Sequence, residues 1–466
     1  MPTSKDRLGL KSHPARLYSK HENGEVTCHL SPRQCRLRPG QPGFCRVRQN
    51  EAGELVTLNY GVSVQLTQEM IETEAVVHHS PGEAILSLGN IGCMLNCDFC
   101  HNWKTSQFRY VEKKDIHHYT PEQVVETALS KGIGILSWTY NDPVVWHEFV
   151  CDTAKLAREH GLLNLYKSAF SISAQAIDQL HPVIDIFSLS LKSMDPDFYR
   201  RVTKGRLEPI LEGIKQVHAY GDRHLELSNL VVTGLNDTLP EVEKVVTWML
   251  NNLGEEVPLH LVRFHPDYKY THVGRTSIAF LKEARLRALE MGLKHVYLGN
   301  VYENHEGLNT YCSHCRHLLV SRFGLQTQTP GIDPAHRCRN CGASTPITFV
   351  PLKKSKTEMR HRREEENMTR FLWHGDINAC HVMLHNPTAV PLTVVCTADS
   401  ASDACGQEIR LAPGERWRFI ASRKAPLEKG VQLIHPAPVQ VSFAEVLDRA
   451  HFPTEALDGQ AQQDLT

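Results

Sequence analysis

Between Glu83 and Val301, short apolar runs rich in β-branched residues alternate with longer stretches whose apolar positions recur at helical spacing. Strands buried on both faces are continuously apolar, so this alternation predicts βαβ units around a parallel sheet. An α/β series of this kind forms a full or partial (β/α) barrel, with its site at the carboxyl ends of the strands. The predicted strands are Ala84–Leu88, Gly134–Thr139, Leu163–Ser168, Ile184–Leu191, Leu225–Val232, Pro258–Phe264 and His295–Gly299.

Two of the intervening helices carry clear signals. Thr120 stands before Pro121, and Gln123 follows at the position that completes a capping box, so a helix is predicted to begin here and to end at Gly132. A second helix is predicted from Pro143 to Gly161 because its apolar residues fall on one face.

The regions around this core differ from it in composition, which predicts further modules. Turn-forming residues surround three cysteines before the barrel, two cysteine pairs follow it, and a strongly charged run then leads into short alternating strands. The predicted organisation is an N-terminal Cys-containing segment (1–75), the barrel (76–305), a zinc-ribbon-like module (306–350), a charged linker (351–370) and a small all-β module with a polar tail (371–466).

The overall charge of the chain does not indicate a binding partner. A formal net charge of -1 gives no global attraction to nucleic acid or to an anionic membrane, and the chain has no apolar run long enough for a signal peptide or a membrane span. We therefore expect a cytoplasmic protein that does not bind membranes and has little affinity for nucleic acid. In a reducing compartment, grouped cysteines favour metal over disulfides, and most of the 14 cysteines are grouped.

The most informative group is Cys93, Cys97 and Cys100, which directly follows the first predicted strand, with the aromatic Phe99 before the third cysteine. Three thiolates at this spacing can bind three irons of a [4Fe–4S] cluster and leave the fourth iron open to substrate. The alternative is a zinc site of three cysteines completed by His101.

The sequence from Leu86 to Gln107 around these cysteines resembles the radical S-adenosylmethionine (SAM) member of the AmmeMemoRadiSam group, whose relatives are the pyruvate formate-lyase activating enzymes. Further segments are similar to that group in the same order, and the resemblance covers about residues 25–350: Thr139–Pro143, Gly234–Asp237, Arg263–Tyr268 and Tyr297–Val301. It implies a [4Fe–4S] cluster, SAM, and an external low-potential electron donor of the flavodoxin or ferredoxin type. Reductive cleavage of SAM would then give a 5′-deoxyadenosyl radical that abstracts hydrogen from substrate, with no catalytic side chain beyond the cluster and SAM.

The same resemblance suggests cofactor contacts at Phe99, within the cysteine loop, and at three strand ends. Tyr140, Asn141 and Asp142 would hydrogen-bond the SAM ammonium, unless this segment only forms a turn that caps the next helix. In Ser190-Leu191-Lys192, the relatives carry Asp at the first position; Lys192 would meet the SAM carboxylate, or it is a surface lysine. His265 is a weaker candidate for contact with the ribose, the adenine or the substrate.

The remaining cysteines suggest further metal sites. Cys312, Cys315, Cys338 and Cys341 have zinc-ribbon spacing, with a second iron–sulfur cluster as the alternative. Cys28, Cys35 and Cys45 form an incomplete set, because Ser31 occupies the position of a fourth cysteine in the resembled group. A metal site completed by His29 and a metal-free fold both remain open for this set.

These features are compatible with three functions. A radical SAM enzyme acting on a protein or another large partner is favoured, because activating-enzyme relatives act on a protein backbone. An iron–sulfur and zinc protein for electron transfer or metal sensing, without SAM cleavage, is the alternative; a dedicated carrier would normally close its cluster with four cysteines. A zinc-based nucleic-acid-binding protein lacks support from the charge.

Overall fold

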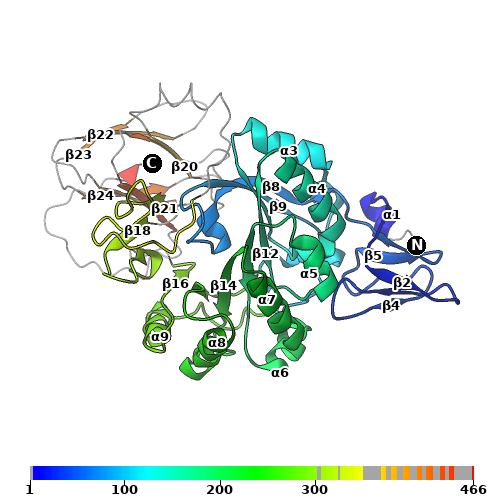
Figure 1. The fold of residues 1–466 in the computed structure, drawn as a ribbon. Helices are drawn as coiled ribbons and strands as arrows, with labels where there is room; N and C mark the ends of the chain where they lie inside the picture. The colour runs from blue at the N-terminus through cyan, green and yellow to red at the C-terminus, as the bar shows by residue number, and fades with distance from the viewer. Residues whose placement is uncertain are drawn as a thin grey trace. The chain divides into compact units, whose positions relative to one another are not determined.

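The computed structural model describes residues 4–301, 306–323 and 326–349, together with the backbone of separate strands between 369 and 465. The chain divides into two compact units, Met1–Ser355 and Lys356–Thr466. Figure 1 traces the chain by colour from the N-terminus to the C-terminus.

An eight-stranded sheet forms the centre of the first unit (Figure 1). Seven strands are parallel, as predicted, and β8 (Gln65–Met70) joins one edge antiparallel to β9. The sheet is open in the described residues, with β8 and β16 at its edges, so the expected barrel is a partial one. In order from the other edge, the strands are β16 (Val296–Gly299), β15 (Leu259–Arg263), β14 (His224–Val231), β13 (Ile186–Ser190), β12 (Leu163–Ser168), β11 (Ile135–Thr139) and β9 (Ala84–Gly89).

All seven predicted strands are present, with ends that differ by a few residues. β8 was not predicted, because only Leu66 and Met70 of its residues are apolar, so the segment shows neither an apolar run nor an alternating pattern. The barrel was predicted to begin at residue 76, but β8 lies before that residue and still belongs to the central sheet.

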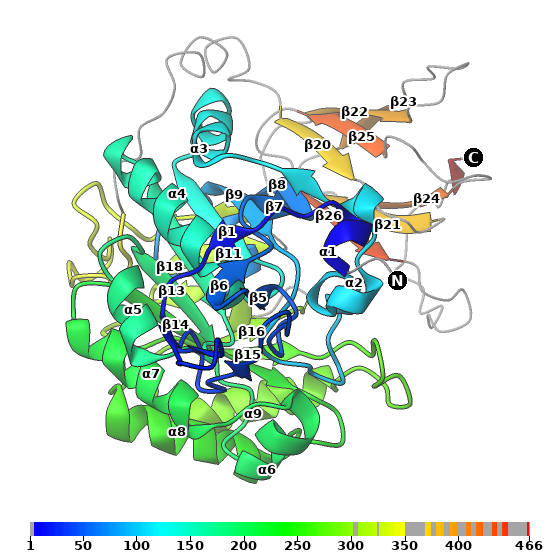
Figure 2. The ribbon, with the colours of Figure 1, turned by 90° about the vertical axis from the view of Figure 1, so that its right-hand side faces the viewer.

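Helices cover the outer face of the sheet (Figure 2). The predicted capping box is confirmed, because the Thr120 side chain accepts from the Gln123 backbone while the Gln123 side chain accepts from the Thr120 backbone. The predicted helix from Pro143 to Gly161 is divided into a 3₁₀ turn, η4 (Pro143–Trp146), and α4. The main helices are α3 (Pro121–Ser130), α4 (His147–Glu159), α5 (Ala174–Leu180), α7 (Glu208–Tyr220), α8 (Leu239–Asn252) and α9 (Ile278–Glu290).

A small apolar layer closes the inner face near the amino ends of the strands. Ile71 begins the 3₁₀ turn η1 (Ile71–Glu74), and Val76 follows this turn. Both side chains pack against one residue from each of four neighbouring strands. Those four residues are Ile85, Ile135, Leu165 and Ile186. The polar residues of the same strands therefore lie between this layer and the carboxyl ends.

Short strands form the N-terminal segment. One sheet has the order β1-β6-β5, another has the order β2-β3-β4, and β7 pairs with β10. Their bounds are β1 (His13–Pro14), β2 (Tyr18–Lys20), β3 (Val26–Cys28), β4 (Arg36–Leu37), β5 (Arg48–Glu51), β6 (Glu54–Thr57), β7 (Val62–Ser63) and β10 (His117–His118).

A three-stranded antiparallel sheet follows the central sheet and carries the paired cysteines. Its strands are β17 (Thr310–Tyr311), β18 (Leu318–Phe323) and β19 (Gln326–Gln328). Its small core includes Leu319, Val320 and Ile332 beside Cys312 and Cys338.

The second unit contains β-strands, as expected for an all-β module. They form two four-stranded sheets, ordered β20-β25-β22-β23 and β26-β21-β24-β27. Nearly all of the predicted charged linker (351–370) lies outside the described residues. The strands are β20 (Thr369–Trp373), β21 (Ala379–His385), β22 (Leu392–Ala398), β23 (Gln407–Leu411), β24 (Arg416–Ser422), β25 (Val431–His435), β26 (Gln440–Glu445) and β27 (Asp464–Leu465).

Within the described residues, no helix combines the length and the apolar character that crossing a membrane would require.

Candidate active site

The three-cysteine loop lies at the carboxyl edge of the central sheet, between β9 and the short helix α2 (Trp103–Ser106). Cys97 is buried, whereas Cys93 and Cys100 are half-buried, and none of the three forms a disulfide. Burial raises the pKa of Cys97 to about 12, and the nearby positive charge of Lys192 opposes this shift. The free thiols are therefore protonated at neutral pH, and metal binding at this loop would release protons.

Asn141, at the end of β11, holds this loop in place. Its side-chain amide donates to the carbonyls of Asn90 and Gly92, the latter at 3.3 Å. Its side-chain oxygen accepts from the Thr105 hydroxyl at 3.0 Å, beyond the third cysteine. One buried side chain therefore joins the two ends of the loop to the neighbouring strand.

Asp142 has the capping role that was one of its two predicted functions. Its carboxylate accepts from the Val144 amide at 3.2 Å and starts η4. It also accepts from the Ser168 hydroxyl at 2.7 Å and the Ala169 amide at 3.1 Å. The side chain thus links the ends of β11 and β12, while its contact with SAM stays a prediction.

Tyr140 adopts a left-handed backbone conformation with φ 65°. Its hydroxyl lies 2.5 Å from the Thr67 hydroxyl of β8, and its carbonyl accepts from the Asn102 side chain. The ring therefore lies against the sheet edge, and the backbone of Tyr140 holds the segment that follows Cys100.

Phe99 is buried in an aromatic cluster beneath the loop. Its ring centroid lies 6.1 Å from that of Phe198 and 6.5 Å from that of Phe264, which follows β15. This packing anchors the middle of the cysteine loop to two other segments of the carboxyl edge.

Lys192 lies on the same side as the cysteines. Its ammonium is 6.0 Å from the Phe99 ring centroid, and within the described residues it has no hydrogen-bond or ion-pair partner. Its charge acts on the thiols of both Cys97 and Cys100. A half-buried cation beside the loop is suited to receive a carboxylate, and the predicted contact with the SAM carboxylate stays a prediction.

Ser190 ends β13 and contacts Ser228, with their hydroxyl oxygens 3.1 Å apart. The Lys167 ammonium donates to the Ser228 hydroxyl at 3.1 Å and to the Ser188 hydroxyl at 3.0 Å. Burial lowers the pKa of Lys167 to about 8, against the opposing effect of Glu74. Lys167 was not selected from the sequence, although a lysine within a strand predicted to be buried was a usable signal.

His265 is exposed, and its Nδ1 lies 2.7 Å from the carbonyl oxygen of Pro266. In the same segment, Asp267 accepts from the indole of Trp103, which begins α2 just after the cysteine loop, at 2.9 Å. Tyr268 stacks on the same indole, with ring centroids 5.4 Å apart. Asp267 was missed from the sequence, and the role predicted for His265 stays a prediction.

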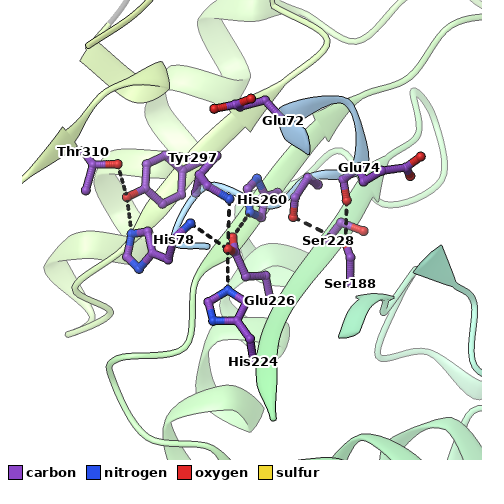
Figure 3. Close-up of polar contacts among 12 residues, drawn as sticks. Glu72, Glu74, His78, Ser188, His224, Glu226, Ser228, His260, Tyr297 and Thr310 are labelled. Atoms are coloured by element: carbon purple, nitrogen blue, oxygen red, sulfur yellow. Dashed lines mark hydrogen bonds and ion pairs between the residues drawn. The ribbon is translucent and has the colours of Figure 1, made fainter. Parts of the chain in front are cut away.

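A second polar cluster lies at the opposite, amino end of the strands (Figure 3). The buried Glu226 accepts from the backbone amides of Val77 and His78 at 2.9 and 2.8 Å. It also accepts from the rings of His224 and His260 at 2.8 and 2.7 Å. Burial opposes ionisation, but the two histidines hold the pKa of Glu226 well below its usual range. This cluster fixes the segment before β9 to the sheet, far along the strands from the cysteine loop.

The four cysteines of the ribbon converge. The ligand atoms of Cys312, Cys315, Cys338 and Cys341 all lie within 4.8 Å of one another. In the described part of the chain this is the one group close enough to hold a single metal ion. The zinc alternative for the three-cysteine loop, completed by His101, therefore gains no support from the geometry.

Comparison with known proteins decides the family. The model of the "Radical SAM superfamily" matches residues 90–249. An uncharacterized protein of Methanocaldococcus jannaschii is 37% identical over 336 residues, which cover 72% of this chain and 99% of the relative. The chain belongs to the radical SAM superfamily. The residues that match the superfamily model include the cysteine loop.

More distant relatives cover smaller parts of this radical SAM protein. The (2S)-3-sulfopropanediol dehydratase activating enzyme of Klebsiella oxytoca is 24% identical over 171 residues, covering 36% of this chain and 53% of the relative. A domain of pyruvate-formate lyase-activating enzyme from Bacteroides vulgatus is 17% identical, covering 35% of this chain and 98% of the domain, with a TM-score of 0.31. A superposition at that score carries no weight for function.

Membership of the superfamily implies a [4Fe–4S] cluster and SAM, and the donor set of the loop fits both. Cys93, Cys97 and Cys100 supply three thiols, and their loop contains no fourth cysteine. Lys192 supplies a cation without a protein partner in the described residues. The four ribbon cysteines can hold a further metal ion.

Proposed function

We propose that this chain is a radical SAM enzyme that abstracts hydrogen from a protein or another large substrate. The observation that carries the proposal is the three-cysteine loop at the carboxyl edge of the parallel sheet, with the Lys192 ammonium beside it. Three thiols leave one iron of a [4Fe–4S] cluster available to SAM.

When bound, the cluster and SAM would supply reductive cleavage of the sulfonium and a radical that abstracts hydrogen. The protein then has to position the reactants. Asn141 would keep the cysteine loop in register with β11, and Lys192 would orient the carboxylate of SAM. Phe99 and its aromatic neighbours would exclude water beneath the loop.

A protein substrate is supported by one relative and by the extra modules. The Klebsiella oxytoca relative is named for activating a dehydratase, which is itself a protein. The four-Cys ribbon and the C-terminal strands add surface that a small substrate would not need. We further propose that zinc occupies the ribbon, because four close thiols suit a tetrahedral ion.

Each cleavage of SAM consumes one electron, so the enzyme also needs a reductant. An external low-potential donor of the flavodoxin or ferredoxin type would supply this electron. The alternative function, an electron carrier or metal sensor that does not cleave SAM, would make no use of an open iron or of the Lys192 ammonium beside the loop.

Formation of 5′-deoxyadenosine tests the proposal. The full-length protein is reconstituted anaerobically with iron and sulfide, then mixed with reductant and SAM. We expect 5′-deoxyadenosine from the native protein and from Cys151→Ala, a buried cysteine of α4 that serves as the control. Cys97→Ala should give none. An intact cluster that produces no 5′-deoxyadenosine would favour the carrier or sensor function instead.

A further inference from the structure

Cys28, Cys35 and Cys45 line one pocket in the N-terminal segment. The amide of Cys28 donates to the carbonyl of Cys35 at 3.0 Å, which pairs the two segments. A Cβ built on Gly43 would lie 3.9 Å from the sulfurs of both Cys35 and Cys45. The fold therefore gathers three free cysteines that are separated in the sequence by six and nine residues.

The fourth position of this pocket belongs to Ser31. Ser31 is among the residues that line the pocket, whereas His29 is not. The His29 ring lies 2.9 Å from the Ser19 hydroxyl, so the imidazole already has a partner. The structure thus disfavours a metal site completed by His29 and leaves three thiols and one hydroxyl.

The pocket also contains a buried positive charge with an unused donor. Arg48 is 1% exposed and forms an ion pair with the equally buried Glu148 at 3.1 Å. Among the described residues, its Nε is a buried donor without a hydrogen-bond partner. A buried charged donor without an acceptor lowers the stability of the fold. Thiolates or sulfide ions in the pocket would supply that acceptor.

A second guanidinium, that of Arg33, lines the same pocket and lies 3.5 Å from the Phe44 ring centroid. Two arginines beside three thiols favour an anionic group. A [4Fe–4S] cluster bound by three thiolates is such a group, because the thiolate charges exceed that of the oxidised core. Among the described residues, the ligand atoms close enough to hold a single metal ion are those of the four ribbon cysteines. The sulfurs of Cys28, Cys35 and Cys45 are not in that set, which argues against zinc in this pocket.

This pocket lies directly behind the active-site loop. Met94, which follows Cys93, lines it, and the Arg33 Nε donates to the Met94 carbonyl at 2.9 Å. A Cβ built on Gly92 would lie only 2.9 Å from the Cys45 carbonyl oxygen. The peptide that carries Cys93 therefore contacts the segment that carries Cys45.

We propose that Cys28, Cys35 and Cys45 hold a second iron–sulfur cluster that passes electrons to the cluster at Cys93, Cys97 and Cys100. The external donor reduces the second cluster by one electron, and that electron then moves to the first cluster. No bond forms or breaks in this transfer, and the second cluster returns to its oxidised state. The relay role rests on the proposed function, whereas the metal site does not.

Iron binding without the active-site cluster tests the site. In a full-length variant with Cys93, Cys97 and Cys100 all replaced by alanine, anaerobic reconstitution should still give about four irons per chain. Because the Ser31 hydroxyl lies at the fourth position of this pocket, the electron paramagnetic resonance signal of the reduced variant should not respond to SAM. Adding Cys35→Ala should remove this iron, whereas adding Cys151→Ala should leave it.

Two outcomes would overturn the site. The first is a triple variant that binds no iron although its circular dichroism matches the native protein. The second is iron that persists after Cys35→Ala and Cys28→Ala, which would place it in the four-Cys ribbon. For the relay, Cys28→Ala in the otherwise native chain should slow reduction of the active-site cluster by reduced flavodoxin; an unchanged rate would remove the relay role. None of these measurements requires SAM cleavage, so they stay distinct from the test of the proposed function.

Discussion

The side-chain amide of Asn141 donates to the carbonyl of Gly92 at 3.3 Å and so connects the end of β11 to the peptide that precedes Cys93. The same side chain accepts from Thr105, on the far side of the cysteines. The loop that holds the cluster is therefore fixed at both ends by one buried residue of the neighbouring strand.

Replacing Asn141 by alanine should loosen this loop. Loss of buried hydrogen bonds typically costs about 1–3 kcal/mol, so the free energy of unfolding should fall by that order. Iron should also leave the reconstituted protein faster when a chelator is added. Asn252→Ala is the matched control, because that amide donates to the Trp248 carbonyl at the exposed end of α8, its one hydrogen bond among the described residues. Equal iron release from both variants would remove the positioning role of Asn141.

Lys192→Met should weaken SAM binding. Removing one charge-assisted hydrogen bond costs about 1.5–3 kcal/mol, so the Kd for SAM should rise roughly tenfold or more. Equilibrium dialysis of SAM against the reconstituted protein measures this change. Lys215→Met, which removes a lysine paired with Glu212 on α7, should leave the Kd unchanged. A Kd for Lys192→Met equal to that of the native protein would show that this lysine does not hold the cofactor.

Cys338→Ala should lose about one zinc ion per chain while the cluster of the active-site loop remains. The reason is that the four ribbon thiols form a closed set, apart from the three-cysteine loop in the sequence. Metal analysis after reconstitution in the presence of both zinc and iron measures this. If Cys338→Ala and Cys97→Ala lose the same amount of iron, the ribbon holds a second cluster and not zinc.

Stability should fall in mild acid because of His79. Burial lowers the pKa of His79 to about 3, below the value of 6.5 expected in the unfolded chain. Between these two values the unfolded state binds the proton more readily, so stability falls as the pH falls from about 6.5 towards 3. The slope is up to about 1.4 kcal/mol per pH unit for this one group.

Urea unfolding at several pH values between about 7 and 5 measures that slope. His79→Gln should flatten the curve, because glutamine has no proton to gain in this range. His160→Gln is the control, since that ring lies at the exposed end of α4. Identical slopes for the native protein and His79→Gln would contradict the assignment.

The parallel strands of the central sheet could be predicted because they are buried on both faces and therefore read as apolar runs. β8 could not, since Gln65–Met70 is mostly polar and lies at an edge of the sheet, so it shows no apolar run. The cysteine loop was predictable from spacing because its three ligands lie within eight residues of the sequence. In contrast, the contact of Trp103 with Asp267 joins residues 164 positions apart, and no local pattern encodes it.

Residues with two possible roles were the hardest to resolve from the sequence. Asp142 caps η4 in the structure, which the pattern Asn-Asp-Pro suggested, but the same pattern also suggested a cofactor contact. Lys167 was overlooked because it occupies a strand that was interpreted as core. Its hydrogen bonds to Ser188 and Ser228 come from strands that are adjacent only in the folded sheet.

The central claim is that three cysteines hold a cluster whose fourth iron binds SAM. Electron–nuclear double resonance on the reduced, reconstituted protein, with SAM labelled with ¹⁵N at its amino group, tests this most directly. The account predicts a hyperfine coupling between the cluster and the label in the native protein and in Cys151→Ala, and none in Cys97→Ala. A reduced cluster in the native protein that shows no coupling to labelled SAM would contradict it.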